Sequence, residues 1–226
     1  MSRLPSRPKV AFQGEHGAFS EDAAIELLGP EIDLVPRPTF AALFSGLAEG
    51  LADYALVPVE NSLVGAIQPA LDLLLESSLL TAGEVVIQVR QQLIGCPGAV
   101  FEEIEAVESH PAALGQCKRF FAANPQILPV ETEDTAGSVA RIIERGDRKR
   151  AALAGRRAAA IYGGSILSEN VEDDQENYTR FLLLVAESTL VRIGGVSARV
   201  ARSSGSSSGQ IRAGNPASLK QTKEKS

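Results

Sequence analysis

Short apolar runs alternate with longer amphipathic segments along the chain. The apolar runs have the length and composition of strands, and they lie at residues 9–13, 32–36, 54–59, 83–95, 104–109, 127–130 and 151–154. The segments between them repeat apolar residues at the spacing of one buried helix face, at residues 21–28, 40–47, 67–75, 111–121, 136–143 and 156–161. This alternation predicts an α/β fold.

The stretch from Asn177 to Val185 begins polar and becomes continuously apolar. Such a run is expected of a strand buried on both faces. Thr179 and Arg180 then lie at the mouth of a rigid element, where a hydroxyl can donate a proton and a guanidinium can hold a carboxylate. Taken alone, the stretch fits a strand edge with a surface Arg better.

Polar side chains also follow the third predicted strand, in the sequence Glu60-Asn61-Ser62. Open α/β sheets bind ligands at the carboxyl ends of their strands, and Asn61 and Ser62 can both donate and accept hydrogen bonds. A turn that caps the helix at 67–75 explains the same residues equally well.

Two further helix starts carry polar groups. The hydroxyls of Thr135 and Ser138, together with free backbone N–H groups, can face a carboxylate, although capping by Asp134 or Thr135 explains them as well. In the helix predicted at 111–121, Gln116 lies beside an apolar stripe, and His110 at its start is interpreted as structural.

The segment from Gly14 to Ser20 joins the first predicted strand to the first predicted helix. A glycine-rich turn in this position can present backbone N–H groups to an anion. A spacing of two glycines is weak evidence, so a plain tight turn is favoured. His16 in this turn is not expected to be catalytic.

Charge is unevenly distributed over the 226 residues. From Arg192 onward seven Lys and Arg residues accompany one acid, a net charge of +6. Because the whole chain carries −6, residues 1–191 carry −12. An acidic body argues against nucleic acid as a partner. Residues 192–226 are rich in Ser, Gly and basic residues and are predicted to be a disordered basic tail.

Composition excludes several other classes. Hydrophobic residues make up 44% of the chain, enough for a core, and no run approaches the ~20 apolar residues of a membrane span. The basic N-terminus leads into a strand and not into a signal-peptide core, so a cytoplasmic location is expected. Cys96 and Cys117 are then interpreted as reduced thiols, and no cluster of metal ligands is recognisable.

Several motifs occur in a fixed order and closely resemble prephenate dehydratase, an enzyme family of phenylalanine biosynthesis. They are Val57-Pro58-Val59-Glu60-Asn61-Ser62 with Gly65, His110-Pro111 with Leu114, Gln116 and Cys117, Asp134-Thr135-Ala136-Gly137-Ser138, and Asn177 with Thr179-Arg180-Phe181. The resemblance covers about residues 8–186.

The resemblance implies a fold and a site. The fold is α/β and two-lobed, like a type II periplasmic binding protein, with residues 8–79 and 165–187 in the first lobe, residues 80–164 in the second and the active site in the cleft between them. Thr179 is implied to be catalytic. The residues implied to bind substrate are Arg180, Phe181, Asn61, Ser62, Gln116 and Thr135.

The implied reaction is the decarboxylating dehydration of prephenate to phenylpyruvate, with no metal or organic cofactor, in a homodimer or higher homo-oligomer. Two alternatives stay open: arogenate as substrate, and a two-lobed module that binds a small carboxylic acid without turnover. Members usually continue into an ACT domain marked by Glu-Ser-Arg-Pro. Here Glu187-Ser188 is followed by Thr189-Leu190, so that regulatory domain is not expected.

Overall fold

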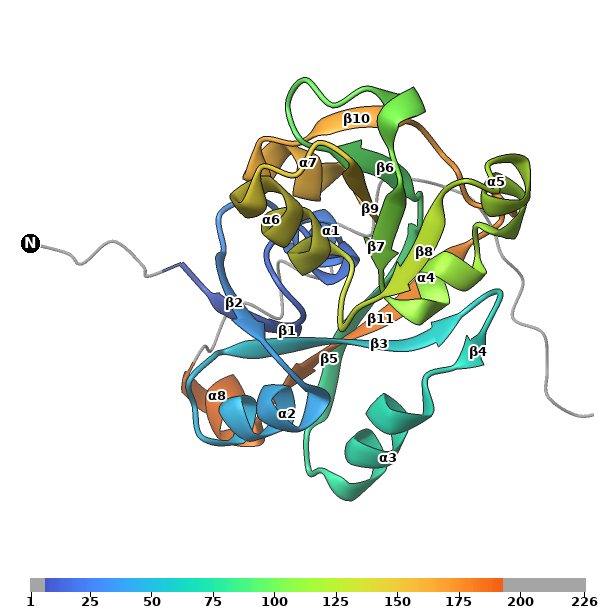
Figure 1. The fold of residues 1–226 in the computed structure, drawn as a ribbon. Helices are drawn as coiled ribbons and strands as arrows, with labels where there is room; N and C mark the ends of the chain where they lie inside the picture. The colour runs from blue at the N-terminus through green and yellow to red at the C-terminus, as the bar shows by residue number, and fades with distance from the viewer. Residues whose placement is uncertain (1–6, 193–226) are drawn as a thin grey trace, which may run out of the picture.

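The computed structural model describes residues 7–192 and contains two sheets, one in each half of the molecule (Figure 1). The first sheet has the strand order β2-β1-β3-β11-β5, with the short β4 paired to β3. Its strands are β1 (Lys9–Gln13), β2 (Asp33–Arg37), β3 (Tyr54–Asn61), β4 (Gly65–Ala66), β5 (Leu80–Gln88) and β11 (Tyr178–Val185). Strand β11 runs antiparallel to both β3 and β5.

Helices cover both faces of this first sheet. They are α1 (Phe19–Leu28), α2 (Phe40–Ala48) and α3 (Gln68–Glu76), and a short helix α8 (Glu187–Arg192) follows β11. On one face Leu43 and Leu47 of α2 pack with Val57 of β3. On the other face Ala23 and Ala24 of α1 pack with neighbours that include Phe181. Burial on both faces explains the near-continuous apolar strands.

The second half repeats this layering around the sheet β10-β6-β9-β7-β8. Its strands are β6 (Gln92–Gly95), β7 (Ala106–Ser109), β8 (Leu128–Glu131), β9 (Arg150–Ala154) and β10 (Ser165–Ser168). Its helices are α4 (Pro111–Gly115), α5 (Lys118–Ala123), α6 (Ala136–Arg145) and α7 (Arg156–Tyr162), with a 3-10 turn at Phe101–Glu103. The predicted two-lobed α/β architecture is confirmed.

The chain crosses between the halves twice, after β5 and after β10. β5 pairs with β11 in the first sheet, and β10 pairs with β6 in the second. Both crossings therefore lie later in the chain than the predicted boundaries at 79/80 and 164/165, and those boundaries are corrected accordingly. The predicted long strand at 83–95 is two strands, because residues 89–91 leave one sheet before the next begins.

Two other elements differ from prediction. The helix expected at 111–121 is divided into α4 and α5, because the Asp173 carboxylate accepts from the backbone N–H groups of Lys118 and Arg119 at 2.9 and 2.8 Å and so starts a new helix there. Helix α8 occupies residues 187–192, where no element was expected. The rest of the predicted tail, 193–226, lies outside the described residues.

Candidate active site

A cavity of about 590 Å³ lies between the two halves. Five of the seven predicted site residues line it: Asn61, Gln116, Thr135, Thr179 and Phe181. They come from both halves, so tertiary folding brings together side chains that are far apart along the chain. The cavity wall is mostly apolar with a few polar groups, which is the usual composition of a small-molecule site.

Thr179 lies at the polar end of β11 and pairs in register with Asn61 of β3. The Asn61 Nδ2 group donates to Thr179 Oγ1 at 2.9 Å and to Asn177 Oδ1 at 2.7 Å. The Asn61 side-chain oxygen accepts from the backbone N–H groups of Leu63 and Val64, which fixes the amide orientation. Because Thr179 Oγ1 accepts from Asn61, its own hydrogen is available to a molecule in the cavity.

Asn177 continues this network into the second half. Its side chain is fully buried, and its Nδ2 donates to Gln116 Oε1 at 3.0 Å. Since the oxygen of Gln116 is occupied, its N–H₂ group remains for a ligand. A chain of side-chain amides therefore connects Thr179 in the first sheet to Gln116 at the end of α4.

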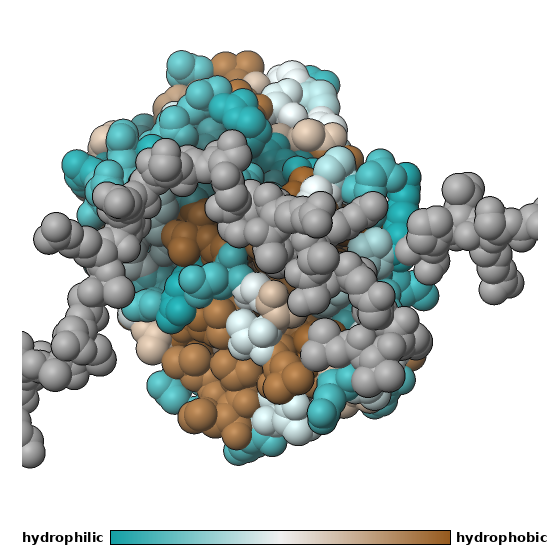
Figure 2. All heavy atoms as spheres, turned by 180° about the vertical axis from the view of Figure 1, so that it is seen from behind, coloured by the Kyte–Doolittle hydropathy of each residue, from teal (hydrophilic) through white to brown (hydrophobic). Residues whose placement is uncertain are grey.

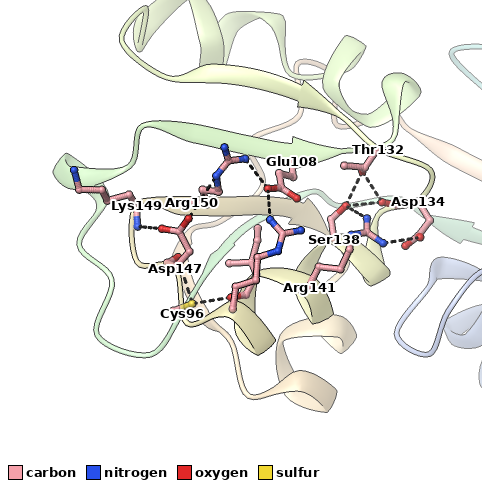
Figure 3. A network of polar contacts seen from close by, with 11 residues as sticks. Cys96, Glu108, Thr132, Asp134, Ser138, Arg141, Asp147, Lys149 and Arg150 are labelled. Carbon is pink, nitrogen blue, oxygen red and sulfur yellow. Dashed lines mark hydrogen bonds and ion pairs between the residues drawn. The ribbon is translucent and has the colours of Figure 1, made fainter.

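The start of α6 is held by a separate network (Figure 3). Ser138 Oγ lies 2.7 Å from Thr132 Oγ1, donates to the Asp134 carbonyl at 2.7 Å and accepts from Arg141 Nη2 at 3.0 Å. The Ser138 hydroxyl is therefore fully used inside the protein and does not face a ligand, contrary to one interpretation of the sequence. Within residues 7–192, the side chain of Thr135 makes no capping bond, and the residue lies at the cavity wall where its hydroxyl can meet a ligand.

Several helices begin at the cavity wall. The first residues of α1, α3 and α6 all line it, and the N-terminal N–H groups of a helix attract anions. Among the lining residues there is no Lys or Arg. His110 also lines the cavity, and its Nδ1 accepts from the Ala112 N–H at 3.1 Å as the cap of α4. Glu15, Glu133 and Asp134 also line the cavity, so a carboxylate must be held by hydroxyls, amides and backbone N–H groups.

Arg180 and Ser62, which were also predicted to bind substrate, do not line the cavity. Successive side chains of a strand point to opposite faces, so Arg180 faces away from Thr179 and Phe181. Arg180 is 43% exposed and forms ion pairs with Glu60 and Glu84 at 3.2 and 3.6 Å. The Ser62 hydroxyl donates to the Glu176 carbonyl at 2.7 Å and accepts from the Tyr178 N–H at 2.9 Å, so it fastens the ends of β3 and β11.

The Gly14–Ser20 turn has two functions in the structure. Gly14, Glu15 and Ala18 line the cavity. On its other side the turn contacts the second half, where the Tyr162 hydroxyl donates to the His16 carbonyl at 2.9 Å. His16 itself lies 3.0 Å from the Glu21 carboxylate and not in the cavity wall.

Cys117 is not a nucleophile in this site. Its side chain is fully buried, and burial, with smaller contributions from the Asp173 and Glu172 carboxylates, raises the pKa of the thiol to about 12. Burial likewise raises the pKa of Cys96. Both cysteines are free thiols, as the sequence predicts.

Several lining residues were not predicted from the sequence, among them Gln91 and Glu133. Gln91 lies in the first crossing between the halves, and Glu133 precedes α6. Neither residue belongs to a recognisable sequence motif, because each reaches the cavity only through the path of the chain between the sheets. Asn177 was part of a motif but was not named as a site residue, although an amide beside Thr179 is a usable signal.

Comparisons with known proteins identify the family. A family profile described as prephenate dehydratase matches residues 10–189. Arogenate dehydratase/prephenate dehydratase 1 of Arabidopsis thaliana is 40% identical over 187 residues, covering 83% of this chain and 47% of that protein. The bifunctional chorismate mutase/prephenate dehydratase of Aquifex aeolicus (strain VF5) is 35% identical, covering 80% and 49%.

Solved structures agree. Prephenate dehydratase from Arthrobacter aurescens, in complex with L-Phe, has a TM-score of 0.72 at 27% identity, covering 78% of this chain and 60% of that one. A quorum quenching acylase, GqqA, has a TM-score of 0.72 at 33% identity, covering 79% and 64%. The chain spans about half the length of the curated relatives it matches. On the profile match, the chain belongs to the prephenate dehydratase family.

Proposed function

We propose that this chain catalyses the decarboxylating dehydration of prephenate to phenylpyruvate, in L-phenylalanine biosynthesis. The observation that carries the proposal is the Thr179 hydroxyl, oriented by Asn61 at 2.9 Å, in a cavity whose wall contains Phe181 and several helix starts. An apolar cavity suits the ring of the substrate, and the helix starts suit its two carboxylates.

The reaction breaks two bonds between ring carbons and their substituents and leaves the ring intact. The bond to the ring carboxylate breaks to release CO2, its electron pair moves into the ring, and the hydroxyl at the opposite carbon leaves as water after taking up a proton. Aromatisation supplies the driving force. Thr179 hydrogen-bonds the departing oxygen, and Gln116 and Thr135 donate to carboxylate oxygens. A donor already in place where charge develops is an effective form of transition-state stabilisation.

The proposed roles are tested by three variants at neighbouring positions. Thr179→Val keeps the shape of the side chain and removes its hydroxyl, so kcat for phenylpyruvate formation is expected to fall about 10²–10³-fold. Thr179→Ser keeps the hydroxyl and is expected to recover much of that loss. Arg180→Gln, which lies outside the cavity, is expected to leave kcat/KM within about threefold of the wild type. Equal rates for wild type and Thr179→Val contradict the proposal.

Three other functions are weighed against this one. Arogenate differs from prephenate only in an amino group, so both substrates belong in the same assay. A binding module without turnover predicts tight prephenate binding by calorimetry with no product. Acyl hydrolysis, the activity for which GqqA is named, needs an activated nucleophile. In the described residues no Ser or Thr hydroxyl of the cavity is bonded to a His, which favours the dehydratase.

We also propose a homodimer or higher homo-oligomer. Strand β5 is an edge of the first sheet, and its Leu80 and Val86 are 44% and 55% exposed. Figure 2 shows apolar surface gathered over the lower half of the back face, the half that holds this sheet. Light scattering coupled to size exclusion tests the proposal, and a monomer at micromolar concentration contradicts it.

A cytoplasmic location is proposed on the two buried free thiols. Separately, none of the helices between residues 7 and 192 has the length and apolar character needed to span a bilayer. Cell fractionation with an antibody to the protein tests the location, and recovery in an exported fraction contradicts it.

A further inference from the structure

Gln91 is a buried polar side chain in the wall of the cavity. It is 2% exposed, it lines the cavity, and its side-chain oxygen has no hydrogen-bond partner among the described residues. Leaving a buried amide oxygen unpaired is costly, and such groups are rare in native proteins. Because this cavity also contains Thr179 and Gln116, the unpaired oxygen of Gln91 is available to a ligand bound beside them.

The backbone around Gln91 is fixed, which makes its side chain a defined feature of the wall. The Gln91 N–H donates to Glu172 Oε2 at 2.8 Å, and the Gln91 carbonyl accepts from the Val171 N–H at 2.9 Å. The other carboxylate oxygen of Glu172 accepts from Arg90 Nη1 at 2.9 Å. The two segments that cross between the halves are joined at this point, so the backbone of Gln91 is held in place at the cavity wall.

We infer that Gln91 is a substrate-binding residue of this site and hydrogen-bonds a polar group of the bound substrate through its side-chain amide. This inference rests on the proposed function, and it adds a residue from the crossing segment to those around Thr179. The unpaired atom is an acceptor, so it pairs with a donor of the substrate, such as the ring hydroxyl of prephenate or the ammonium group of arogenate.

The adjacent residue provides a matched control. Gln92 is also 2% exposed and also has a buried side-chain oxygen without a partner among the described residues. It points to the other side of the crossing, into a separate cavity of about 530 Å³ that contains neither Thr179 nor Gln116. Its Nε2 donates to the Arg90 carbonyl at 3.3 Å and to Asn170 Oδ1 at 3.2 Å.

The test compares Gln91→Met with Gln92→Met in the full chain, since Met has nearly the shape of Gln without its hydrogen-bonding groups. Gln91→Met is expected to lower kcat/KM for prephenate or arogenate at least tenfold, largely through KM, while the melting temperature stays the same or rises. Gln92→Met is expected to lower the melting temperature and to leave kcat/KM within threefold. A folded Gln91→Met variant within twofold of wild type, or an equal loss of kcat/KM in both variants, overturns the inference.

Binding separates this inference from the proposed function. If the wild type turns over neither substrate, the dehydratase proposal fails, and calorimetric titration with prephenate then tests Gln91 by itself. A tenfold or larger rise in Kd for Gln91→Met, absent from Gln92→Met, supports the inference. No binding of prephenate to the wild type overturns both proposals.

Discussion

At the scale of single residues, the site depends on which of two adjacent side chains faces the cavity. Thr179 and Arg180 are neighbours in one strand, yet Thr179 is 8% exposed and bonded to Asn61, whereas the Arg180 side chain reaches Glu60 and Glu84 on the opposite face. The two are separated because side chains alternate between the faces of a strand. Although Arg180 follows Thr179 in the sequence, its guanidinium therefore does not lie next to the Thr179 hydroxyl in the structure.

Cys117 gives a residue-level prediction with a pH dependence. The folded thiol has a pKa of about 12, against an ordinary value of 9.0. The native protein at pH 8 is therefore expected to resist alkylation by iodoacetamide, because the thiolate is the reactive form, and protein in urea is expected to react. The stabilising contribution of the neutral thiol is complete below pH 9 and is lost as the pH rises from 9 towards 12.

The check is mass spectrometry of native and denatured samples after the same exposure to reagent. Rapid modification of Cys117 in the native protein would show that the thiol is neither buried nor neutral. Urea titrations at pH 8 and pH 11 provide the second measurement. Cys117→Ala is the reference in those titrations, because it removes the thiol and with it this part of the pH dependence.

At the scale of elements, the two segments that cross between the halves are bonded to each other. Strands β5 and β11 lie side by side in the first sheet, and the segments that leave and re-enter it are joined by Glu172. The Glu172 side chain is fully buried and accepts from both Arg90 and the Gln91 backbone. A buried carboxylate is tolerated only when its oxygens are satisfied in this way.

Glu172→Gln is expected to destabilise the protein by about 2–3 kcal/mol, because the amide removes the charge that Arg90 pairs with and turns an N–H₂ group towards a donor. Glu84→Gln is the control: Glu84 is 64% exposed and pairs loosely with Arg180, so its loss is expected to cost less than about 0.5 kcal/mol. Urea unfolding measures both variants. Equal stability in the two would show that the crossing does not depend on this carboxylate.

At the scale of the whole molecule, the cleft depends on how closely the halves approach. Gly17 has a φ of +87°, and a Cβ placed there would lie 2.7 Å from the Ala158 backbone in α7. No side chain fits that contact, so glycine sets the distance between the first turn of one half and a helix of the other. The same turn forms part of the cavity wall, so this distance also shapes the site.

Gly17→Ala is therefore expected to lower the free energy of unfolding by about 2–4 kcal/mol, through backbone strain and a clash, and to lower kcat/KM. Gly50→Ala separates the two causes, because Gly50 also has a positive φ of +73° but open space around it. Gly50→Ala is expected to lower the free energy of unfolding by only about 1–2 kcal/mol and to leave kcat/KM unchanged. Denaturant titration and the dehydration assay check both variants, and similar losses in both would remove the inter-half contact as the cause.

Much of this protein follows from its sequence alone. The strands and helices lie close to where the apolar periodicity places them, because local pattern and tertiary burial agree along both sheets. Thr39 caps α2, as expected of a threonine just before a helix, with its hydroxyl oxygen accepting from the Ala42 N–H at 3.1 Å. The order of the motifs was sufficient to indicate the family, and the residues that it marked include five that line the cavity: Thr179, Asn61, Gln116, Thr135 and Phe181.

Only the tertiary structure decided which polar groups share the cavity. Ser62 and Arg180 leave the site because hydrogen bonds and ion pairs on the outer side of the sheet use them, and Gln91 enters it because the chain crosses between the halves at that point. Local sequence encodes the direction of a strand and the type of a turn. It does not encode which distant segment lies alongside, since that is determined by how two separate sheets pack around a shared cleft.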